Sequence, residues 1–248
     1  MRPWFEEWFN SPYYHQLYFK RDEAEAKRFI NKLIGCLQPA PQSRMLDIAC
    51  GSGRHSRILA ELGFEVTGID LAADIIREAK RYETEKLHFF VHDMRLPAWI
   101  NYFDYAFNFF TSFGYFDTRR EHEDALRTIA QALKGGGIFV IDYLNARFAE
   151  EHLVPTSEIL IDNVRYRITR WTDATHFFKH IIVEGGDLAN PIEHTEKVTK
   201  FSLPEFSEML GRQELLVEQV FGDYNFSSFD PAHSPRMILF ARKQRPNG

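Results

Sequence analysis

The chain has 248 residues, 44% of them hydrophobic and 26% charged, which is ordinary for a soluble globular protein and long enough for one large α/β domain or a domain with an insert. Its formal net charge of −5 gives no overall attraction to a polyanion, so nucleic acid is disfavoured as a partner. It has no apolar run of membrane-spanning length, and its two cysteines give neither a disulfide framework nor a metal-binding spacing, so we expect a cytoplasmic protein with no metal site.

The N-terminal residues 1–40 are predicted to form a helical cap or lid. Residues 3–20 are rich in aromatic side chains, and the spacing of Trp4, Phe5, Trp8 and Phe9 after Pro3 predicts a short amphipathic helix that Asn10-Ser11-Pro12 breaks. A second helix over Asp22–Leu37 has an apolar stripe, and Gly35 and Pro39 weaken and then end it. The aromatic segment either caps a sheet or closes over a ligand, and the sequence leaves both interpretations open.

A strand–turn–helix–strand unit follows at Arg44–Asp70. Met45–Ala49 reads as a buried strand, and the turn Gly51-Ser52-Gly53 leads into a helix over Arg54–Leu62. The next strand, Phe64–Ile69, ends at Asp70. This arrangement allows a ligand to approach the backbone at the N-terminus of a helix.

Acidic residues in this unit discriminate between two classes of nucleotide ligand. The fingerprint of a dinucleotide site, G-x-G-x-x-G/A, ends in glycine or alanine, where this chain has Ser56. The carboxylate of Asp47 would also repel a pyrophosphate. The same carboxylate would attract an ammonium or a sulfonium, and Asp70 could accept hydrogen bonds from both hydroxyls of a ribose. The combination predicts S-adenosylmethionine and disfavours an NAD-dependent oxidoreductase.

These residues resemble a known family. Leu46–Ser56, LDIACGSGRHS, is similar to the first motif of class I S-adenosylmethionine-dependent methyltransferases, with Ala49 in place of the usual first glycine, and Gly68–Asp70 resembles their second motif. The similarity continues through Arg95–Pro97, Phe103–Phe116 and Leu133–Asn145. It implies an α/β fold with a Rossmann-like, seven-stranded, mostly parallel sheet, helices on both faces and a terminal antiparallel hairpin.

The resemblance also implies which residues bind the cofactor. The family's Tyr-Tyr-x-x-Leu-Tyr segment is matched by Tyr13–Tyr18, and the acidic residue and its neighbour after the third strand, Leu87–His92, are matched by Asp93 and Met94. Asn108 is a polar residue in the fourth strand, Phe103–Phe110, and is expected to face the mouth of the cleft. The expected cofactor-binding residues are Tyr14, Tyr18, Asp47, Ala49, Gly51, Gly53, His55, Asp70, Leu71, Asp93, Met94, Asn108 and Phe109.

The remaining segments complete the predicted domains. Helices are expected at Ala72–Tyr82 and at Thr118–Leu133, where Thr118 and Glu121 match a capping box, and Gly135–Gly137 should stop the second helix before a strand at Ile138–Tyr143. Residues 146–203 break the βα alternation with consecutive strand-like runs: Glu158–Ile161, Val164–Trp171, His176–Val183 and His194–Phe201. We expect an inserted antiparallel subdomain here, which either covers an acceptor pocket or forms an oligomer interface. Residues 41–145 and 204–248 would then form the cofactor-binding domain, whose last elements are a helix at Pro204–Leu210 and strands at Glu214–Phe221 and Arg236–Arg242.

The predicted function is methyl transfer from S-adenosylmethionine to a nitrogen or oxygen of a small-molecule acceptor. At the end of the predicted fourth strand the chain reads Asn108-Phe109-Phe110-Thr111, and it lacks the proline pair that, in the family, accompanies methylation of nucleobase or glutamine amino groups. A protein or RNA methyltransferase of the same fold, and a non-catalytic cofactor-binding partner subunit, remain alternatives, and a homo-oligomer is left open. No catalytic base is assigned among the candidates His15, His176, His180, His233, Tyr13 and Asn145.

Overall fold

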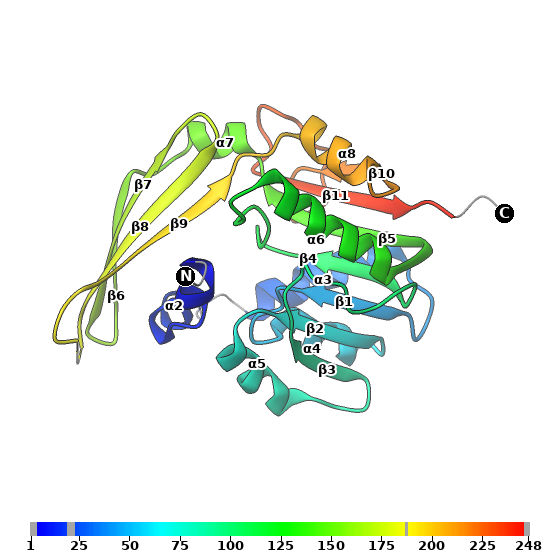
Figure 1. Cartoon of the computed structure of the whole chain (residues 1–248), viewed down its shortest axis with the longest axis horizontal. Helices are drawn as coiled ribbons and strands as arrows, with labels where there is room; N and C mark the ends of the chain where they lie inside the picture. Colours follow the sequence, from blue (N-terminus) through cyan, green and yellow to red (C-terminus); the bar gives the residue numbers. More distant parts are fainter. Residues whose placement is uncertain (1–3, 19–22, 187, 246–248) are drawn as a thin grey trace.

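The computed structural model describes residues 4–18, 23–186 and 188–245, so the predictions for Pro3, Phe19 and Asp22 lie outside it. A seven-stranded sheet has the order β10-β11-β5-β4-β1-β2-β3 (Figure 1). Its strands are β1 (Arg44–Ile48), β2 (Glu65–Asp70), β3 (Leu87–Val91), β4 (Phe103–Asn108), β5 (Leu133–Leu144), β10 (Leu215–Phe221) and β11 (Arg236–Lys243).

One strand runs against the others. Strands β1 to β5 are parallel to one another, whereas β11 is antiparallel to both β5 and β10. The sheet therefore ends in the antiparallel hairpin that the sequence predicts, and the expected Rossmann-like α/β fold is confirmed. From β1 the chain proceeds through β2 to β3 in one direction and through β4 to β5 in the other, which places the topological switch point between β1 and β4.

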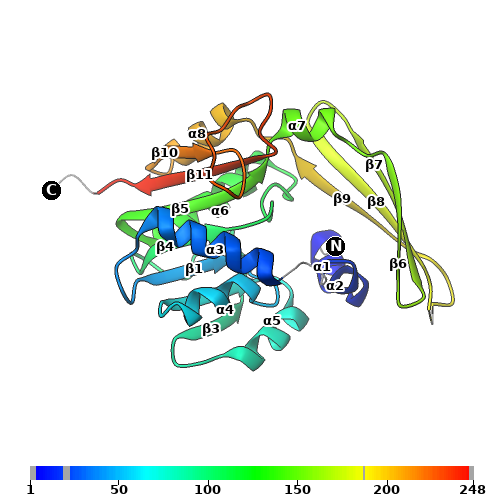
Figure 2. The same ribbon diagram turned by 180° about the vertical axis from the view of Figure 1, so that it is seen from behind.

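Helices cover both faces of this sheet. Figure 2 shows α3 (Glu23–Leu37), α4 (Arg54–Glu61) and α5 (Ala73–Ala79) on one side, where Phe29, Ile58 and Ile76 join a buried apolar cluster. On the other side, α6 (Arg119–Ala132) and α8 (Leu203–Gly211) pack through residues such as Leu126 and Phe206 (Figure 1). No helix within the described ranges is both long enough and apolar enough to cross a membrane.

Two of the predicted helix boundaries differ from the structure. The helix expected over residues 72–82 divides into α5 and a 3₁₀ turn, η1 (Lys80–Tyr82). Thr118 does form the predicted capping box at the start of α6, but Gly135–Gly137 do not stop the helix. Leu133 already has an extended backbone and begins β5, so the glycines lie inside a strand of 12 residues.

A separate four-stranded antiparallel sheet follows the seventh helix, α7 (Ala146–Glu151). Its strands, in the order β6-β7-β8-β9, are β6 (Thr156–Ile161), β7 (Val164–Thr172), β8 (His176–Gly185) and β9 (Ile192–Thr199). The N-terminal helices α1 (Trp4–Phe9) and α2 (Pro12–Tyr18), which are separated at Asn10 and Ser11 as predicted, lie between this sheet and the seven-stranded sheet (Figures 1 and 2). Trp8 joins the apolar cluster of the smaller sheet, and Phe5 joins that of the larger one.

Two glycines allow β3 to pack closely against the first βα unit. An added Cβ at Gly53 would lie 2.4 Å from Cζ of Phe89, and one at Gly68 would lie 2.6 Å from Cδ1 of the same ring. Gly53 also has a φ of +77°, a left-handed conformation that disfavours any residue with a side chain. Phe89 itself is fully buried, so the ring has little room to move away.

We expect Gly53→Ala to lower the free energy of unfolding by about 2–5 kcal/mol, because a left-handed alanine costs about 1–2 kcal/mol and overpacking adds about 1–3 kcal/mol. Gly63→Ala is the matched control, since Gly63 has a φ of +96° but open space where a Cβ would lie. It should show the backbone cost alone. Urea unfolding measures both variants, and equal losses would contradict the packing role of Gly53.

Candidate functional site

Two adjoining cavities lie where the carboxyl ends of β1, β2 and β4 meet, beside the topological switch point. The first has a volume of about 790 Å³ and the second about 980 Å³, and each is open to solvent. Tyr14, Ala49, Gly51 and Ser112 line both of them, so the two cavities share a wall. In α/β sheets this edge is the usual position of ligand sites.

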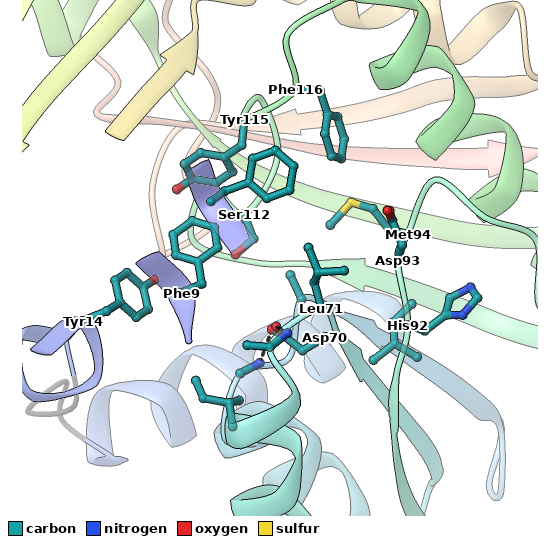
Figure 3. Close-up of a pocket in the computed structure, with 16 residues that line it drawn as sticks. Phe9, Tyr14, Asp70, Leu71, His92, Asp93, Met94, Ser112, Tyr115 and Phe116 are labelled. Atoms are coloured by element: carbon teal, nitrogen blue, oxygen red, sulfur yellow. Dashed lines mark hydrogen bonds between the residues drawn. The ribbon is translucent and has the colours of Figure 1, made fainter. Parts of the chain in front are cut away.

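The first cavity combines a partly buried carboxylate with apolar walls. Asp70, at the end of β2, accepts hydrogen bonds of 2.9 Å from the backbone N–H groups of Gly51 and Ala72. In Figure 3 the rings of Phe9, Tyr14 and Tyr115 lie on one side of the cavity, and Met94 lies on the other. Burial raises the pKa of Asp70, although the backbone hydrogen bonds oppose that effect. The cavity thus offers hydrogen-bond acceptors beside surfaces suited to a flat ring.

Asp93 lies at the edge of the same cavity and is held by Arg95. The guanidinium nitrogen Nη2 of Arg95 lies 2.7 Å from Oδ2 of Asp93, and its Nη1 lies 2.6 Å from Oε1 of Glu121. Burial alone would raise the pKa of Asp93, but hydrogen bonds from Arg95 outweigh it and hold the pKa below its usual value. The side chain is therefore ionised at neutral pH and has a fixed orientation.

The second cavity contains another buried carboxylate, that of Asp47 in β1. This residue is only 2% exposed, and its Oδ2 accepts a 2.5 Å hydrogen bond from the hydroxyl of Ser56. Burial raises the pKa of Asp47 to about 7, and the nearby charge of Asp70 adds to the effect. A carboxyl with a pKa of about 7 is only partly ionised at neutral pH, and an approaching cation or hydrogen-bond donor would favour its ionised form.

The opposite wall of the second cavity is aromatic. Phe109 and Phe110, which follow β4, line it together with His55 from the first turn of α4. The rings of His55 and Phe110 stack with centroids 5.1 Å apart. Ala49, at the point where β1 ends, has a φ of +57° and is not part of the strand, contrary to the sequence prediction, because the backbone turns there toward Gly51.

Two of the expected site residues line neither cavity. Gly53 instead makes room for Phe89, as described above. The expectation that Asn108 faces the mouth of the cleft is wrong: the residue is fully buried, and its Nδ2 donates a 3.1 Å hydrogen bond to the carbonyl of Ile48. This hydrogen bond links the end of β4 to the end of β1. The other eleven line one cavity or both: Tyr14, Tyr18, Asp47, Ala49, Gly51, His55, Asp70, Leu71, Asp93, Met94 and Phe109.

Glu196 in β9 attaches the N-terminal helices to the inserted sheet. Its carboxylate accepts hydrogen bonds from Nε1 of Trp8 at 2.8 Å and from the hydroxyl of Tyr18 at 2.9 Å, and Nζ of Lys179 lies 3.7 Å from it. Burial, and then the charge of Glu196, raise the pKa of Tyr18, so its hydroxyl stays protonated and donates. The insert thus fixes α1 and α2, which carry Phe5, Phe9, Tyr14 and Tyr18 into the cavity walls.

Several residues of the site were given no role by the sequence. Ser112 and Tyr115 lie in the loop after β4, within the stretch Phe103–Phe116 that resembles the family, and line the first cavity. Glu196 lines neither cavity and is separated from its partner Trp8 by 188 positions. Phe9 lies on the predicted aromatic helix, but its spacing indicates burial and not a ligand site. The candidate bases occupy other places: within the described part of the chain, none of His15, His176, His180, His233, Tyr13 and Asn145 lines either cavity.

Comparison with known proteins finds a family model that matches the segment from β1 into β5. Residues 45–137 match the family described as "Methyltransferase domain". A protein of Bacillus subtilis (strain 168) named "Putative methyltransferase YqeM" is 26% identical over 214 residues, which cover 82% of this chain and 85% of that protein. The dTDP-3-amino-3,4,6-trideoxy-alpha-D-glucopyranose N,N-dimethyltransferase of Streptomyces venezuelae is 32% identical over 123 residues, about half of each chain.

Solved structures share the whole fold. An S-adenosylmethionine-dependent methyltransferase from Clostridium acetobutylicum ATCC 824 superposes with a TM-score of 0.77 at 16% identity, covering 94% of this chain and 96% of the other. The sugar N-methyltransferase KedS8 from Streptoalloteichus sp ATCC 53650 gives a TM-score of 0.72 at 19% identity, with 93% of each chain covered. At these identities the likeness establishes the fold.

The attachment through Glu196 can be tested by substitution. We expect Glu196→Ala to destabilise the contact between α1–α2 and the inserted sheet by about 3 kcal/mol, because it leaves the half-buried Lys179 without its carboxylate and removes two hydrogen bonds. Hydrogen exchange of the amides in residues 4–18 should become faster. Glu193→Ala is the control, since Glu193 lies on the same strand but pairs with His180 and is 61% exposed. Unchanged protection in Glu196→Ala would contradict this role.

Proposed function

Because the chain carries a class I S-adenosylmethionine-dependent methyltransferase domain, we propose that it transfers the methyl group of S-adenosylmethionine to a nitrogen or oxygen of a small-molecule acceptor. The observation that carries the proposal is the pair of carboxylates at this sheet edge, the buried Asp47 and the partly buried Asp70, which line the two cavities that share Gly51. One faces each cavity, so a single elongated ligand could contact both.

The residues present fit this cofactor. Gly51 has open space where a Cβ would lie, so a ligand can approach its backbone closely. Asp70 has both oxygens in hydrogen bonds to backbone N–H groups, and each oxygen retains a further lone pair for a ribose hydroxyl. Asp47 accepts hydrogen bonds from Ser56, and the several lone-pair sites of a carboxylate leave acceptor capacity for an ammonium group.

The proposed roles follow from the chemistry of each wall. Asp70 would bind the ribose, Leu71 and Met94 would pack against the adenine, and Asp93 would accept a hydrogen bond from its amino group. Asp47 would bind the ammonium group of the methionine moiety. Phe109, Phe110 and the tyrosines of α2 would exclude water from the second cavity.

S-adenosylmethionine supplies a methyl group on a sulfonium, and its transfer breaks the carbon–sulfur bond as a bond to the acceptor forms. The protein contributes alignment of the two reactants and exclusion of water. Electron-rich aromatic faces attract cations. The rings of Phe9, Tyr14 and Tyr115 therefore suit a site in which positive charge moves from sulfur to an acceptor nitrogen.

Relatives support an amino group on a small molecule as the acceptor. The dTDP-amino-sugar N,N-dimethyltransferase and the sugar N-methyltransferase KedS8 are both named for methylation of nitrogen on a sugar. The inserted sheet would affect acceptor binding indirectly, because it fixes the helices whose side chains line the cavities. We assign residues 146–203 to this supporting role and leave the identity of the amine to experiment.

Calorimetry with S-adenosylhomocysteine tests the proposal. We expect binding of S-adenosylhomocysteine in preference to NAD, and a loss of about 1–3 kcal/mol in binding free energy for Asp70→Ala, because a charged hydrogen-bond partner is removed. Asp74→Ala is the matched control, since Asp74 lies in the first turn of α5 with its side chain 60% exposed and lines neither cavity. It should bind with wild-type affinity.

Preferential binding of NAD would overturn the assignment of the site. Unchanged affinity in Asp70→Ala would remove Asp70 from it. Transfer of a labelled methyl group to amino sugars and to their hydroxyl counterparts then distinguishes nitrogen from oxygen acceptors, and labelling of protein or RNA alone would contradict a small-molecule acceptor.

A further inference from the structure

The corner that follows β4 has an unfavourable backbone conformation. Phe110 has a φ of +55° and Thr111 a φ of +59°, so two successive residues with side chains are left-handed. A β-branched residue such as Thr111 rarely adopts this conformation. Strained backbone of this kind persists only where surrounding contacts fix it, and it is found preferentially at functional sites.

Asp142 in β5 accepts hydrogen bonds from the backbone N–H groups of Phe110 and Thr111, the two residues that form this corner. Its side-chain Oδ2 accepts a 2.9 Å hydrogen bond from the N–H of Phe110, and its backbone carbonyl accepts one of 2.9 Å from the N–H of Thr111. The side chain of Asp142 is completely buried. One residue of the neighbouring strand therefore fixes the position of both strained peptide groups.

Arg236, the first residue of β11, completes the arrangement. Its Nη2 lies 2.7 Å from Oδ1 of Asp142 and donates a 2.9 Å hydrogen bond to Oγ1 of Thr111, and its Nε donates to the same carboxylate at 2.8 Å. The hydroxyl of Tyr224 donates to Oδ2 of Asp142 at 3.1 Å. The carboxylate is thus surrounded by donors, which compensates for its burial.

The corner also determines the shape of the site. Phe109 and Phe110 line the second cavity, Ser112 lines both cavities, and the ring of Phe110 stacks on His55. If the corner relaxed to an ordinary backbone conformation, Phe110 and Ser112 would leave these positions. Neither Asp142 nor Arg236 lines either of the two cavities, so any effect on ligand binding must act through the corner.

We propose that Asp142 and Arg236 are positioning residues for methyl transfer: their buried ion pair holds the strained Phe110–Thr111 corner so that Phe110 and Ser112 form the walls of the cofactor site. The proposal rests on the proposed function, because it assigns S-adenosylmethionine to these cavities. It differs from a purely structural ion pair in that breaking the pair changes ligand affinity in a protein that remains folded.

The test uses Asp142→Asn, Arg236→Lys and the milder Tyr224→Phe, which removes a single hydrogen bond to the Asp142 carboxylate. Two variants are matched controls. Asp104→Asn alters a carboxylate on β4 that pairs with Lys134, and Arg242→Lys alters an arginine on β11 that pairs with Glu218. Thermal unfolding gives the temperature range in which each variant is folded, and calorimetry with S-adenosylhomocysteine is performed well below that transition.

We expect Asp142→Asn and Arg236→Lys to weaken S-adenosylhomocysteine binding by about tenfold or more, as for loss of a charged hydrogen bond, Tyr224→Phe to weaken it less, and both controls to retain wild-type affinity. Hydrogen exchange at Phe110 and Thr111 should become faster in the weakened variants. If Asp142→Asn fails to fold, Arg236→Lys and Tyr224→Phe decide the matter.

Wild-type affinity in folded Arg236→Lys and Tyr224→Phe, or equal weakening in the two controls, would overturn the positioning role and leave the proposed function intact. Absence of S-adenosylhomocysteine binding to the wild-type protein would instead overturn the proposed function, and the positioning role with it.

Discussion

The site depends on two carboxylates held close together at one edge of the sheet, Asp47 buried and Asp70 partly buried. Asp47 in β1 and Asp70 at the end of β2 lie on adjacent strands, desolvation raises the pKa of each, and the charge of Asp70 further raises the pKa of Asp47. Two neighbouring acids that are shielded from water favour a ligand that supplies donors or positive charge. An ammonium group for Asp47 and a pair of hydroxyls for Asp70 would satisfy both. S-adenosylmethionine carries these groups on one molecule.

The packing around this edge of the sheet leaves the backbone at Gly51 accessible to a ligand. Gly53 and Gly68 let Phe89 pack beneath the first turn, and Gly51 leaves its backbone open above it. Helices α1 and α2 contribute aromatic rings to the walls of the cavities. Glu196 fixes these helices to the inserted sheet through hydrogen bonds to Trp8 and Tyr18. None of the described residues of the insert lines either cavity, so its contact with the site runs through α1 and α2.

The sequence predicts the parts of the site that depend on local order. Asp47, Gly51 and Asp70 lie in one βαβ unit, and parallel strands bring their carboxyl ends to the same edge, so their proximity follows from the spacing alone. The direction of a side chain at a strand end does not follow in this way. Asn108 is expected at the mouth of the cleft, but it is fully buried and donates a hydrogen bond to the carbonyl of Ile48 on the neighbouring strand. Glu196 could not be found, since its partners Trp8 and Tyr18 approach it only in the folded chain.

The most direct test of the carboxylate pair is the number of protons released when S-adenosylhomocysteine binds, measured by calorimetry in buffers of different ionisation enthalpy. With a pKa of about 7, Asp47 is mostly protonated near pH 6 in the free protein, and contact with an ammonium group would ionise it. The account predicts release of about one proton per ligand near pH 6, falling toward zero above about pH 8, and loss of that release in Asp47→Asn. No proton release near pH 6, or the same release from Asp47→Asn, would contradict it.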